Sequence, residues 1–566
     1  MSKLSRPSFA ALLLSAAALS SATAQQYGGA FEIEQAIYNF SGNERHGSAC
    51  AYVGDVNADS IGDFLVAAPG FDGASLLNNG AVRLISGADG SLLHQFEGAA
   101  SFDRMGQAVC GIPDIDADLV PDIAISSLAG EGEITLWSGA TRLLIDTIPA
   151  PSGAHDFGCS LALIDDLSSN GFEELLIGAE NTEVLGVAAG AVYAFDLSTR
   201  ANVQTVTGLA LGDSFGCAVA SIADCDTDGI ADYLVSSPGA DPGAMTNAGS
   251  VFLISGADGS TILRVDGTRP GLFLGNSVLG LDDLDLDGTP DFAIGTIRDF
   301  PTGTGGLYIG SVGVHSGSDG SELRRHWGDD SYECFGKSLA LAGDYEGDGL
   351  HEYLVGAPGS LYGGRVYVFY SSLDSGMTIM ESDGPDDEHG LAMAYLGDHD
   401  GDGSEGLLIC SPNADGGVVN GGAAYVREFT GCISASATMI SNAAGGVVIY
   451  DLDFPEDFTN TLTQTYQVLL SGAGAGATDL FGMTAPVGND NLYQDSLSKK
   501  YPGPLSTPFG SLAPDGTASF SATFAAGSLP QLVGRTFHLS AVWYEQGGGQ
   551  FVLRGFARAV PITIDP

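Results

Sequence analysis

Short apolar runs, rather than long amphipathic stretches, make up most of the chain between residues 30 and 430. Gly, Asp and Pro bound these runs, and inside them large and small or apolar and polar side chains alternate, as in residues 80–85. An alternation of period two in runs of this length is typical of β-strands. Few stretches show the helical period, so the pattern predicts an all-β fold.

The apolar runs recur in a fixed arrangement. In each copy a glycine, called here the marker glycine, lies eight residues before the first Asp of an acidic loop. The seven pairs are Gly47 and Asp55, Gly106 and Asp114, Gly158 and Asp166, Gly216 and Asp224, Gly275 and Asp283, Gly336 and Asp344, and Gly390 and Asp398. Successive marker glycines are 52 to 61 residues apart, a length that suits one four-stranded propeller blade. The repeat therefore predicts a seven-bladed β-propeller.

Each unit is read as four strands, with the acidic loop between the first and the second. The third strand begins at a glycine, and the fourth follows a Gly-rich turn. The seventh unit shows only three strands, ending near residue 426, whereas residues 33–40 before the first marker glycine resemble a fourth strand. We therefore expect the N-terminal segment to supply the outer strand of the last blade, which would close the ring and protect its open edge.

The repeat resembles the FG-GAP repeat of the integrin α subunit. The FG element appears literally at Phe157-Gly158, Phe215-Gly216 and Phe335-Gly336, and Ala68-Pro69 and Ala357-Pro358 keep the end of the GAP element. In the other units His46, Met105, Leu274 and His389 occupy the Phe position, where packing is the expected role. The resemblance covers about residues 30 to 430 and implies a β-propeller of the secreted bacterial type, which uses its loop face for binding or adhesion.

The acidic loops place oxygen-bearing side chains at their first, third, fifth and ninth positions. Three loops have Asp at all four: Asp114, Asp116, Asp118 and Asp122; Asp224, Asp226, Asp228 and Asp232; Asp283, Asp285, Asp287 and Asp291. The first loop has Asp55, Asn57, Asp59 and Asp63, and the sixth has Asp344, Glu346, Asp348 and Glu352. Calcium takes six to eight oxygen ligands in irregular geometry, and the seventh residue would add a backbone carbonyl. An EF-hand closes with Glu at the twelfth position between helices, so these loops are not EF-hands.

Two loops depart from this pattern. The third has Asp166, Ser168, Asn170 and Glu174, and the seventh has Asp398, Asp400 and Asp402 with Gly406 at the closing position and Glu405 one residue early. His399 lies inside the seventh loop, where we expect it to face solvent. The alternative for every loop is an acidic turn without an ion, because Asp and Gly favour turns. We expect one structural Ca²⁺ per loop, with weak or no binding at the loops of Asp166 and Asp398.

Composition and charge narrow the class of partner. The formal net charge of −50 argues against nucleic acid and anionic lipid, whose binding requires Lys and Arg. A hydrophobic content of 44% is nevertheless sufficient for a core. Lys3 and Arg6, an apolar stretch over residues 9–19 and small residues at 22–24 predict a signal peptide over residues 1–24. That stretch is too short to span a bilayer, so the sequence predicts a secreted or cell-surface protein without a membrane span.

The remaining chain is expected to form two domains, the propeller over residues 25–430 and a small C-terminal β-sandwich over residues 431–566. Five segments of the second region read as strands: residues 447–450, 466–470, 518–522, 537–543 and 551–556. The resemblance implies a binding module for an extracellular protein or glycan. The alternative is a calcium-dependent hydrolase or lyase acting on polysaccharide or phospholipid, since FG-GAP repeats also occur in a glycosylphosphatidylinositol phospholipase. The sequence contains no H-E-x-x-H, G-x-S-x-G or P-loop motif, which favours binding over catalysis.

The cysteines leave two interpretations open. Cys159 and Cys217 each follow a marker glycine in adjacent units, so a disulfide there would join two blades. Free thiols that fill tight positions are slightly favoured instead. Cys410 and Cys432 are a second candidate pair, at the junction with the C-terminal domain.

Overall fold

The structure, a computed structural model, describes the propeller over residues 30–38, 44–301, 308–345, 349–360, 363–371, 377–382, 386–401, 404–415 and 421–430. Beyond residue 430 it describes the backbone of strands only. The predicted signal peptide over residues 1–24 lies outside the described residues, as do Glu346, Asp348 and Asp402.

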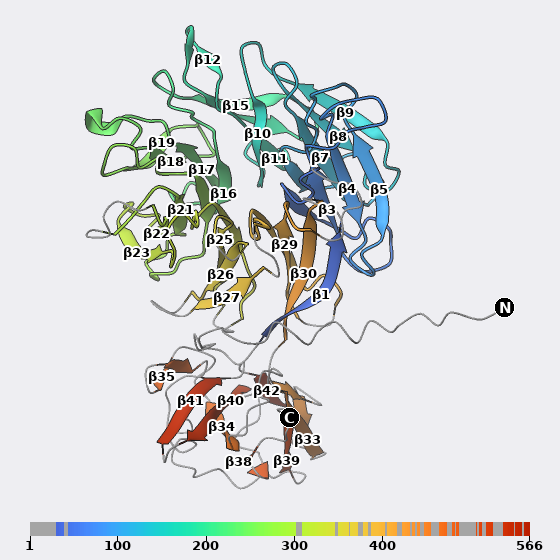
Figure 1. The fold of residues 1–566 in the computed structure, drawn as a ribbon, viewed down its shortest axis with the longest axis vertical. Helices are drawn as coiled ribbons and strands as arrows, with labels where there is room; N and C mark the ends of the chain where they lie inside the picture. The colour runs from blue at the N-terminus through green and yellow to red at the C-terminus, as the bar shows by residue number, and fades with distance from the viewer. Residues whose placement is uncertain are drawn as a thin grey trace, which may run out of the picture.

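Seven antiparallel sheets of four strands each form the propeller, one sheet per sequence repeat (Figure 1). The inner strands are β2 (Cys50–Gly54), β6 (Val109–Ile112), β10 (Phe157–Ile164), β16 (Val219–Ile222), β20 (Ser277–Gly280), β24 (Ser338–Leu341) and β28 (Ala392–Gly397). The second strands are β3 (Asp63–Ala68), β7 (Asp122–Ser127), β11 (Glu174–Ala179), β17 (Asp232–Ser237), β21 (Phe292–Thr296), β25 (Tyr353–Ala357) and β29 (Gly406–Ser411).

The outer half of each blade follows the same order. The third strands are β4 (Ala81–Ile85), β8 (Glu133–Trp137), β14 (Ala191–Asp196), β18 (Ser250–Ile254), β22 (Ser311–His315), β26 (Arg365–Phe369) and β30 (Ala423–Thr430). The outer strands are β5 (Leu92–Glu97), β9 (Leu144–Pro149), β15 (Asn202–Thr207), β19 (Thr261–Asp266), β23 (Glu322–Trp327), β27 (Met377–Glu381) and β1 (Ala30–Tyr38).

The ring closes through the N-terminal strand. Each inner strand contacts the inner strand of the next blade, and β28 of the seventh blade contacts β2 of the first. Strand β1 pairs antiparallel with β30, with Ile37 opposite Ala424 and Tyr38 opposite Ala423, and the two lie side by side in Figure 1. The predicted closure by the segment before the first marker glycine is therefore confirmed.

The backbone conformation explains why glycine occupies each marker position. All seven have positive φ angles, from 82° at Gly336 and Gly390 to 99° at Gly47, a region that residues with a Cβ rarely adopt. A Cβ on Gly106 would also lie 2.9 Å from Cβ of Ala67 in the preceding blade. In six of the seven units the residue before the marker forms a bridge to the glycine that starts the preceding third strand, as between Met105 and Gly80. The FG element thus joins each blade to the one before it.

The hydrophobic core lies between the blades. Seven clusters of buried residues each combine side chains of two adjacent blades, including the seventh and the first. Strand β3 shows how this arises from the period of two. Phe64 and Val66 pack toward the seventh blade, whereas Leu65 and Ala67 pack toward the second. Both faces of the second strands are buried, which explains why they read as continuous apolar runs.

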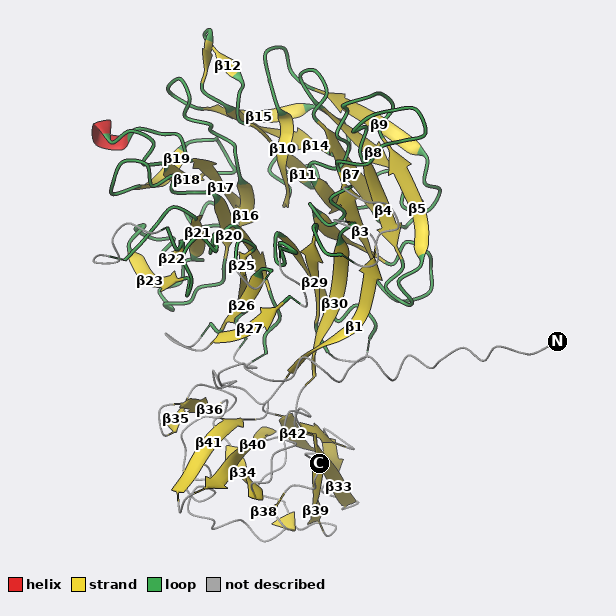
Figure 2. Cartoon of the chain, viewed as in Figure 1, coloured by secondary structure: helices red, strands yellow, loops and turns green. Residues whose placement is uncertain are grey.

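The remaining elements of the described propeller are minor. They are the hairpin β12 (Glu183–Val184) and β13 (Val187–Ala188) and one 3₁₀ turn over Pro242–Ala244, drawn in red in Figure 2. The described residues are all-β, as predicted. No helix among them has the length and hydropathy of a membrane-spanning segment.

The C-terminal region contains two larger sheets. One has the order β31 (Ile433–Ala435), β33 (Gly446–Asp453), β39 (Thr517–Phe524), β37 (Leu505–Ser506). The other has the order β32 (Met439–Ser441), β42 (Val560–Asp565), β40 (Thr536–Gly547), β34 (Thr463–Ser471), β38 (Phe509–Ser511), with β41 (Gln550–Phe556) on β40, and β35 (Thr478–Leu480) pairs with β36 (Met483–Ala485). All five predicted strands fall within these elements. The packing of the two sheets into a sandwich stays a prediction.

Candidate metal sites in the acidic loops

The acidic loops all lie at the same end of the blades. Each connects the end of an inner strand to the start of a second strand, as residues 223–231 do between β16 and β17. Because these strands are antiparallel, the marker glycines and the GAP-like ends lie at the opposite end of the propeller. One end of the propeller therefore carries the acidic loops, and the other end carries the marker glycines and the GAP-like ends.

The closing carboxylate, at the ninth loop position, anchors the first, second, fourth and fifth loops, which are called here the regular loops. Asp232 is fully buried at the start of β17, and it accepts hydrogen bonds from the backbone N–H of Cys225 at 2.8 Å and of Gly256 at 3.0 Å. The same two bonds, to the second loop residue and to the glycine two residues after the third strand, recur at Asp63, Asp122 and Asp291. This side chain therefore ties the loop to two strands of its own blade.

The first and fifth loop positions shape the turn. Oδ2 of Asp224 accepts the N–H of Gly229 at 2.7 Å, and Oδ1 of Asp228 accepts the N–H of Ile230 at 2.9 Å. Equivalent bonds occur in the second and fifth loops. Carboxylates that accept backbone N–H groups hold a turn in one conformation while keeping lone pairs for another partner. The loops are thus preorganised by their own side chains.

Three of the loops bring carboxylate oxygens together. In each, oxygens of the first, third and ninth residues all lie within 4.8 Å of one another. The groups are Asp114, Asp116 and Asp122; Asp224, Asp226 and Asp232; Asp283, Asp285 and Asp291. The fifth-position residues Asp118, Asp228 and Asp287 were predicted with them but are not members of these groups. An all-oxygen set on a short loop suits a hard divalent cation such as Ca²⁺.

The pKa values of the closing carboxylates are raised, chiefly by burial and in smaller part by the neighbouring carboxylates. Burial, opposed by two backbone hydrogen bonds and reinforced by neighbouring loop carboxylates, raises the pKa of Asp232 to about 6. The pKa values of Asp63, Asp122 and Asp291 are also raised to about 6, by burial and by the corresponding carboxylates of their own loops. A bound cation would relieve the repulsion and favour the ionised carboxylates.

The first, third and sixth loops keep the anchor but vary in the other positions. In the first, Oδ1 of Asn57 accepts the N–H of Asp59 at 2.9 Å. In the third, Glu174 accepts the N–H of Leu167 at 2.6 Å, and the Asn170 amide donates to Asp196. The further bonds of these loops are from Gly171 to Asp166, from Gly349 to Asp344, and from Tyr345 to Glu352. Asn170 is therefore directed at a neighbouring carboxylate of its own blade.

The seventh loop is built differently, and here one prediction is wrong. His399 was expected to face solvent, but it is buried, and its Nδ1 lies 3.6 Å from Oε1 of Glu428. Ligand atoms of His399, Asp400 and Glu428 lie within 4.8 Å of one another. In the regular loops the second position holds a partly or fully buried apolar residue, as at Val56 and Leu284. His399 takes that position because Gly406 leaves space beside it.

Sequence analysis missed Glu428, although the strand register points to it. Glu428 on β30 lies directly opposite Gly406, the position where the other blades have their closing carboxylate. The carboxylate has thus moved from the second strand to the facing residue of the third. Glu405 does not replace it, because its side chain lies against Gly343 in the loop of the sixth blade.

Seven four-stranded blades, each begun by a marker glycine and each carrying an acidic loop between its first two strands, define an FG-GAP β-propeller. No protein-family model matches the chain. Human Integrin alpha-6 is 29% identical over 226 residues, covering 34% of this chain and 19% of the integrin. Integrin alpha-5 of Xenopus laevis is 27% identical over 241 residues, covering 39% and 22%.

A third relative is of another kind. Phosphatidylinositol-glycan-specific phospholipase D of Mus musculus is 33% identical over 171 residues, covering 27% of this chain and 20% of the phospholipase. The chain thus matches about a fifth of the length of these relatives. The similarity supports the FG-GAP propeller, and the activities of the whole relatives are a separate question.

Proposed function

We propose that this chain is an extracellular binding module whose FG-GAP propeller is held rigid by Ca²⁺. The convergence of three carboxylates within 4.8 Å in each of three loops carries the proposal. Without a cation these carboxylates repel one another at neutral pH, and burial together with this repulsion raises the pKa values of their closing members. A folded state that carries such clusters is stabilised by a divalent cation of matching geometry.

The role proposed for Ca²⁺ is structural. The closing carboxylate connects the loop to its second and third strands, so an ion bound there would strengthen the blade at the end where the inner strand turns back. The predicted ligands already accept backbone hydrogen bonds. They are therefore held in place by the fold, as ligands of a structural ion should be.

The opposite end of the propeller is the proposed binding face. It contains a cavity of about 490 Å³ between the entries to the first, sixth and seventh blades. Its charged lining residues are Arg45, Lys337, Asp386 and Glu388. Arg45 and Glu388 form an ion pair at 3.2 Å across the seam between the last and first blades. A concave site with charges of both signs suits polar ligands such as peptides or glycans.

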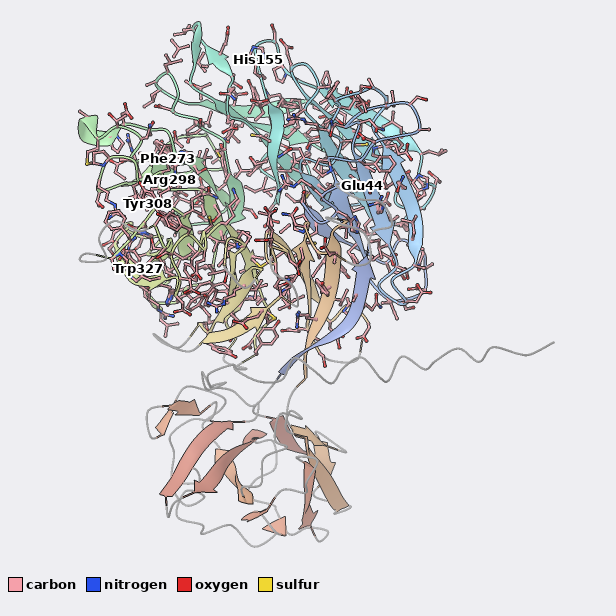
Figure 3. All side chains as sticks on the ribbon, viewed as in Figure 1. Glu44, His155, Phe273, Arg298, Tyr308 and Trp327 are labelled. Carbon is pink, nitrogen blue, oxygen red and sulfur yellow. The ribbon has the colours of Figure 1, made fainter. Side chains whose placement is uncertain are left out.

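Cations paired with aromatic rings extend this face over the fifth blade. The Arg298 guanidinium lies 4.4 Å from the centre of the Phe273 ring, and Arg269 lies 3.7 Å from the centre of the Phe300 ring. Figure 3 labels Phe273, Arg298 and Tyr308 on the same side of the molecule. Arginine and aromatic side chains are enriched at binding surfaces. They make this end a better candidate for a ligand than the acidic end.

The integrin similarity supports a protein ligand outside the cell, in agreement with the secreted or cell-surface location expected from residues 1–24. The phospholipase similarity is the one observation that favours the alternative, a hydrolase acting on phospholipid. Two of the histidines are poor candidates for catalytic residues of such a hydrolase. His46 and His389 are buried at the Phe position of the repeat, and burial lowers the pKa of each to about 3.

Calcium titration of the full chain tests the proposal. The protein is freed of metal and titrated with Ca²⁺ by calorimetry, and native mass spectrometry counts the bound ions. We expect at least three ions, one for each loop with a convergent carboxylate group. The substitution Asp226→Asn should remove one, whereas the matched change Asp258→Asn, in an exposed turn of the same blade, should remove none. Failure to bind Ca²⁺ at millimolar concentration would refute the calcium role.

A second experiment addresses the binding face. The calcium-loaded protein is applied to arrays of extracellular-matrix proteins and glycans, and its hydrolysis of phospholipid and polysaccharide is measured in parallel. We expect binding that is weakened by Arg45→Glu and unchanged by the same charge reversal at Arg142, whose guanidinium donates to the carbonyl of Val56 at the acidic end. Hydrolysis without binding would favour the enzyme alternative.

A further inference from the structure

Two positions of the repeat hold cysteine only at the seam between the first and last blades. The first is three residues after the marker glycine, where Cys50 stands. The other six blades have apolar residues there: Val109, Leu161, Val219, Val278, Leu339 and Met393. The second is the glycine position of the GAP element, where Cys410 stands. The other six blades have Ala67, Ser126, Gly178, Ser236, Gly295 and Gly356.

These two exceptions meet in space. Cys50 lies on the inner strand of the first blade and Cys410 on the second strand of the seventh. Both belong to the apolar cluster that joins these blades, with Cys410 in its buried centre and Cys50 packed against it. The neighbouring Cys50 thiol, together with burial, raises the pKa of the Cys410 thiol well above its ordinary value, in keeping with their shared place in this cluster. Side chains in this part of the repeat do reach an adjacent blade, since Oγ of Ser160 donates to the carbonyl of Gly216 at 3.0 Å.

We propose that Cys50 and Cys410 form a disulfide that joins the first blade to the last when the protein is exported to an oxidising compartment. The step is a thiol–disulfide exchange with a small-molecule or protein disulfide as oxidant. The half-buried Cys50 thiolate attacks the oxidant disulfide and releases one reduced thiol. Cys410 then attacks the mixed disulfide at the sulfur of Cys50, and the second oxidant thiol leaves. The two protein thiols lose two electrons and two protons, and the oxidant gains them.

This bond would add a covalent link to a seam that strand pairing, apolar packing and the Arg45–Glu388 ion pair hold closed. Strand β1 joins the outer edge of the seventh blade, whereas the disulfide would join the blades near their inner strands. A link between residues 50 and 410 closes nearly the whole propeller into one loop, which restricts the unfolded chain most strongly. Cys159 and Cys217, the cysteines that follow two successive marker glycines, lie in the third and fourth blades. The continuous chain already connects these two blades.

Differential labelling tests the pairing. Full-length protein is exported without reductant and unfolded in iodoacetamide, then reduced and labelled with a second alkylating reagent. We expect Cys50 and Cys410 in the second pool and the peptide that links them in an unreduced digest. If both cysteines remain in the first pool even after treatment with oxidised glutathione, the proposal is wrong. A link from Cys410 to Cys432, or from Cys159 to Cys217 with Cys50 free, would overturn it equally.

Stability provides a second readout. The variants Cys50→Val and Cys410→Ser introduce the residue types that other blades have at these positions, so both should fold. We expect reductant to lower the melting temperature of the wild type by roughly 3 to 8 °C and to leave both variants unchanged. The matched control Cys225→Ser, in the fourth acidic loop, should keep the full response to reductant. A wild type that does not respond would contradict the proposal.

Discussion

The fourth and seventh acidic loops show how one repeat supports two kinds of site. In the fourth, Asp232 at the start of the second strand anchors the loop, and Asp224 and Asp226 converge with it. In the seventh, glycine replaces the anchor, and a carboxylate from the facing strand enters beside an imidazole. An all-carboxylate group suits a hard cation such as Ca²⁺, whereas an imidazole nitrogen does not belong to the usual calcium set. The regular loops are therefore the calcium candidates, and the seventh is not their equivalent.

Removal of calcium should produce the largest effect in this comparison. We expect a chelator to lower the melting temperature of the calcium-loaded protein by about 10 °C or more, because several ions that bind only the folded state act together. Differential scanning calorimetry with and without excess Ca²⁺ measures the change. Magnesium, which demands a smaller octahedral site, should restore only part of the stability. An unchanged melting temperature would mean that the loops are acidic turns.

Paired substitutions compare the two loops directly. The double change Asp226→Asn with Asp228→Asn should abolish one Ca²⁺ and reduce the chelator-sensitive shift by at most about a third, since at least three loops share it. The double change Asp398→Asn with Asp400→Asn should leave the number of bound Ca²⁺ ions unchanged. Native mass spectrometry gives both counts. Equal losses from the two variants would show that the seventh loop binds Ca²⁺ like the others.

Conversion of the seventh loop sharpens the comparison further. Gly406→Asp alone should destabilise the blade, because a Cβ at Gly406 would lie 2.8 Å from Nδ1 of His399. The double variant His399→Leu with Gly406→Asp restores the residue types of the regular loops. We expect it to bind one additional Ca²⁺, detected by calorimetry, and to recover most of the lost melting temperature. A double variant that folds but gains no ion would mean that position nine is not what separates the two loops.

The pH dependence should give the smallest effect. The pKa of Asp232 in the folded protein, about 6, lies above its ordinary value of 3.8. Between these values the metal-free folded state holds more protons than the unfolded chain, so its stability falls as pH rises from about 4 to 6. Protons compete with calcium for the same oxygens, so the calcium-loaded protein should show a flatter or opposite slope. Melting curves across this range, with and without Ca²⁺, measure both slopes.

The blade count and the closure were predictable because their signals are local and repeated. The positive φ angle at each marker position favours glycine, so the marker can be recognised in a single repeat, and its recurrence from Gly47 onward in seven repeats fixes the blade count. The missing fourth strand of the last unit likewise indicated that β1 would complete it. The clean acidic loops were predictable for the same reason, since the residues that converge lie within nine positions of one another.

The partners that distinguish one blade from another were decided by the tertiary structure. Glu428 reaches the seventh loop because the register of β29 and β30 sets it opposite Gly406, and a shift of one residue would turn its side chain to the other face of the sheet. Cys50 and Cys410 meet only because the ring closes, although 360 residues separate them in the chain. Local backbone geometry can be read from short motifs, whereas contacts between strands and blades depend on register and closure, which the whole fold determines.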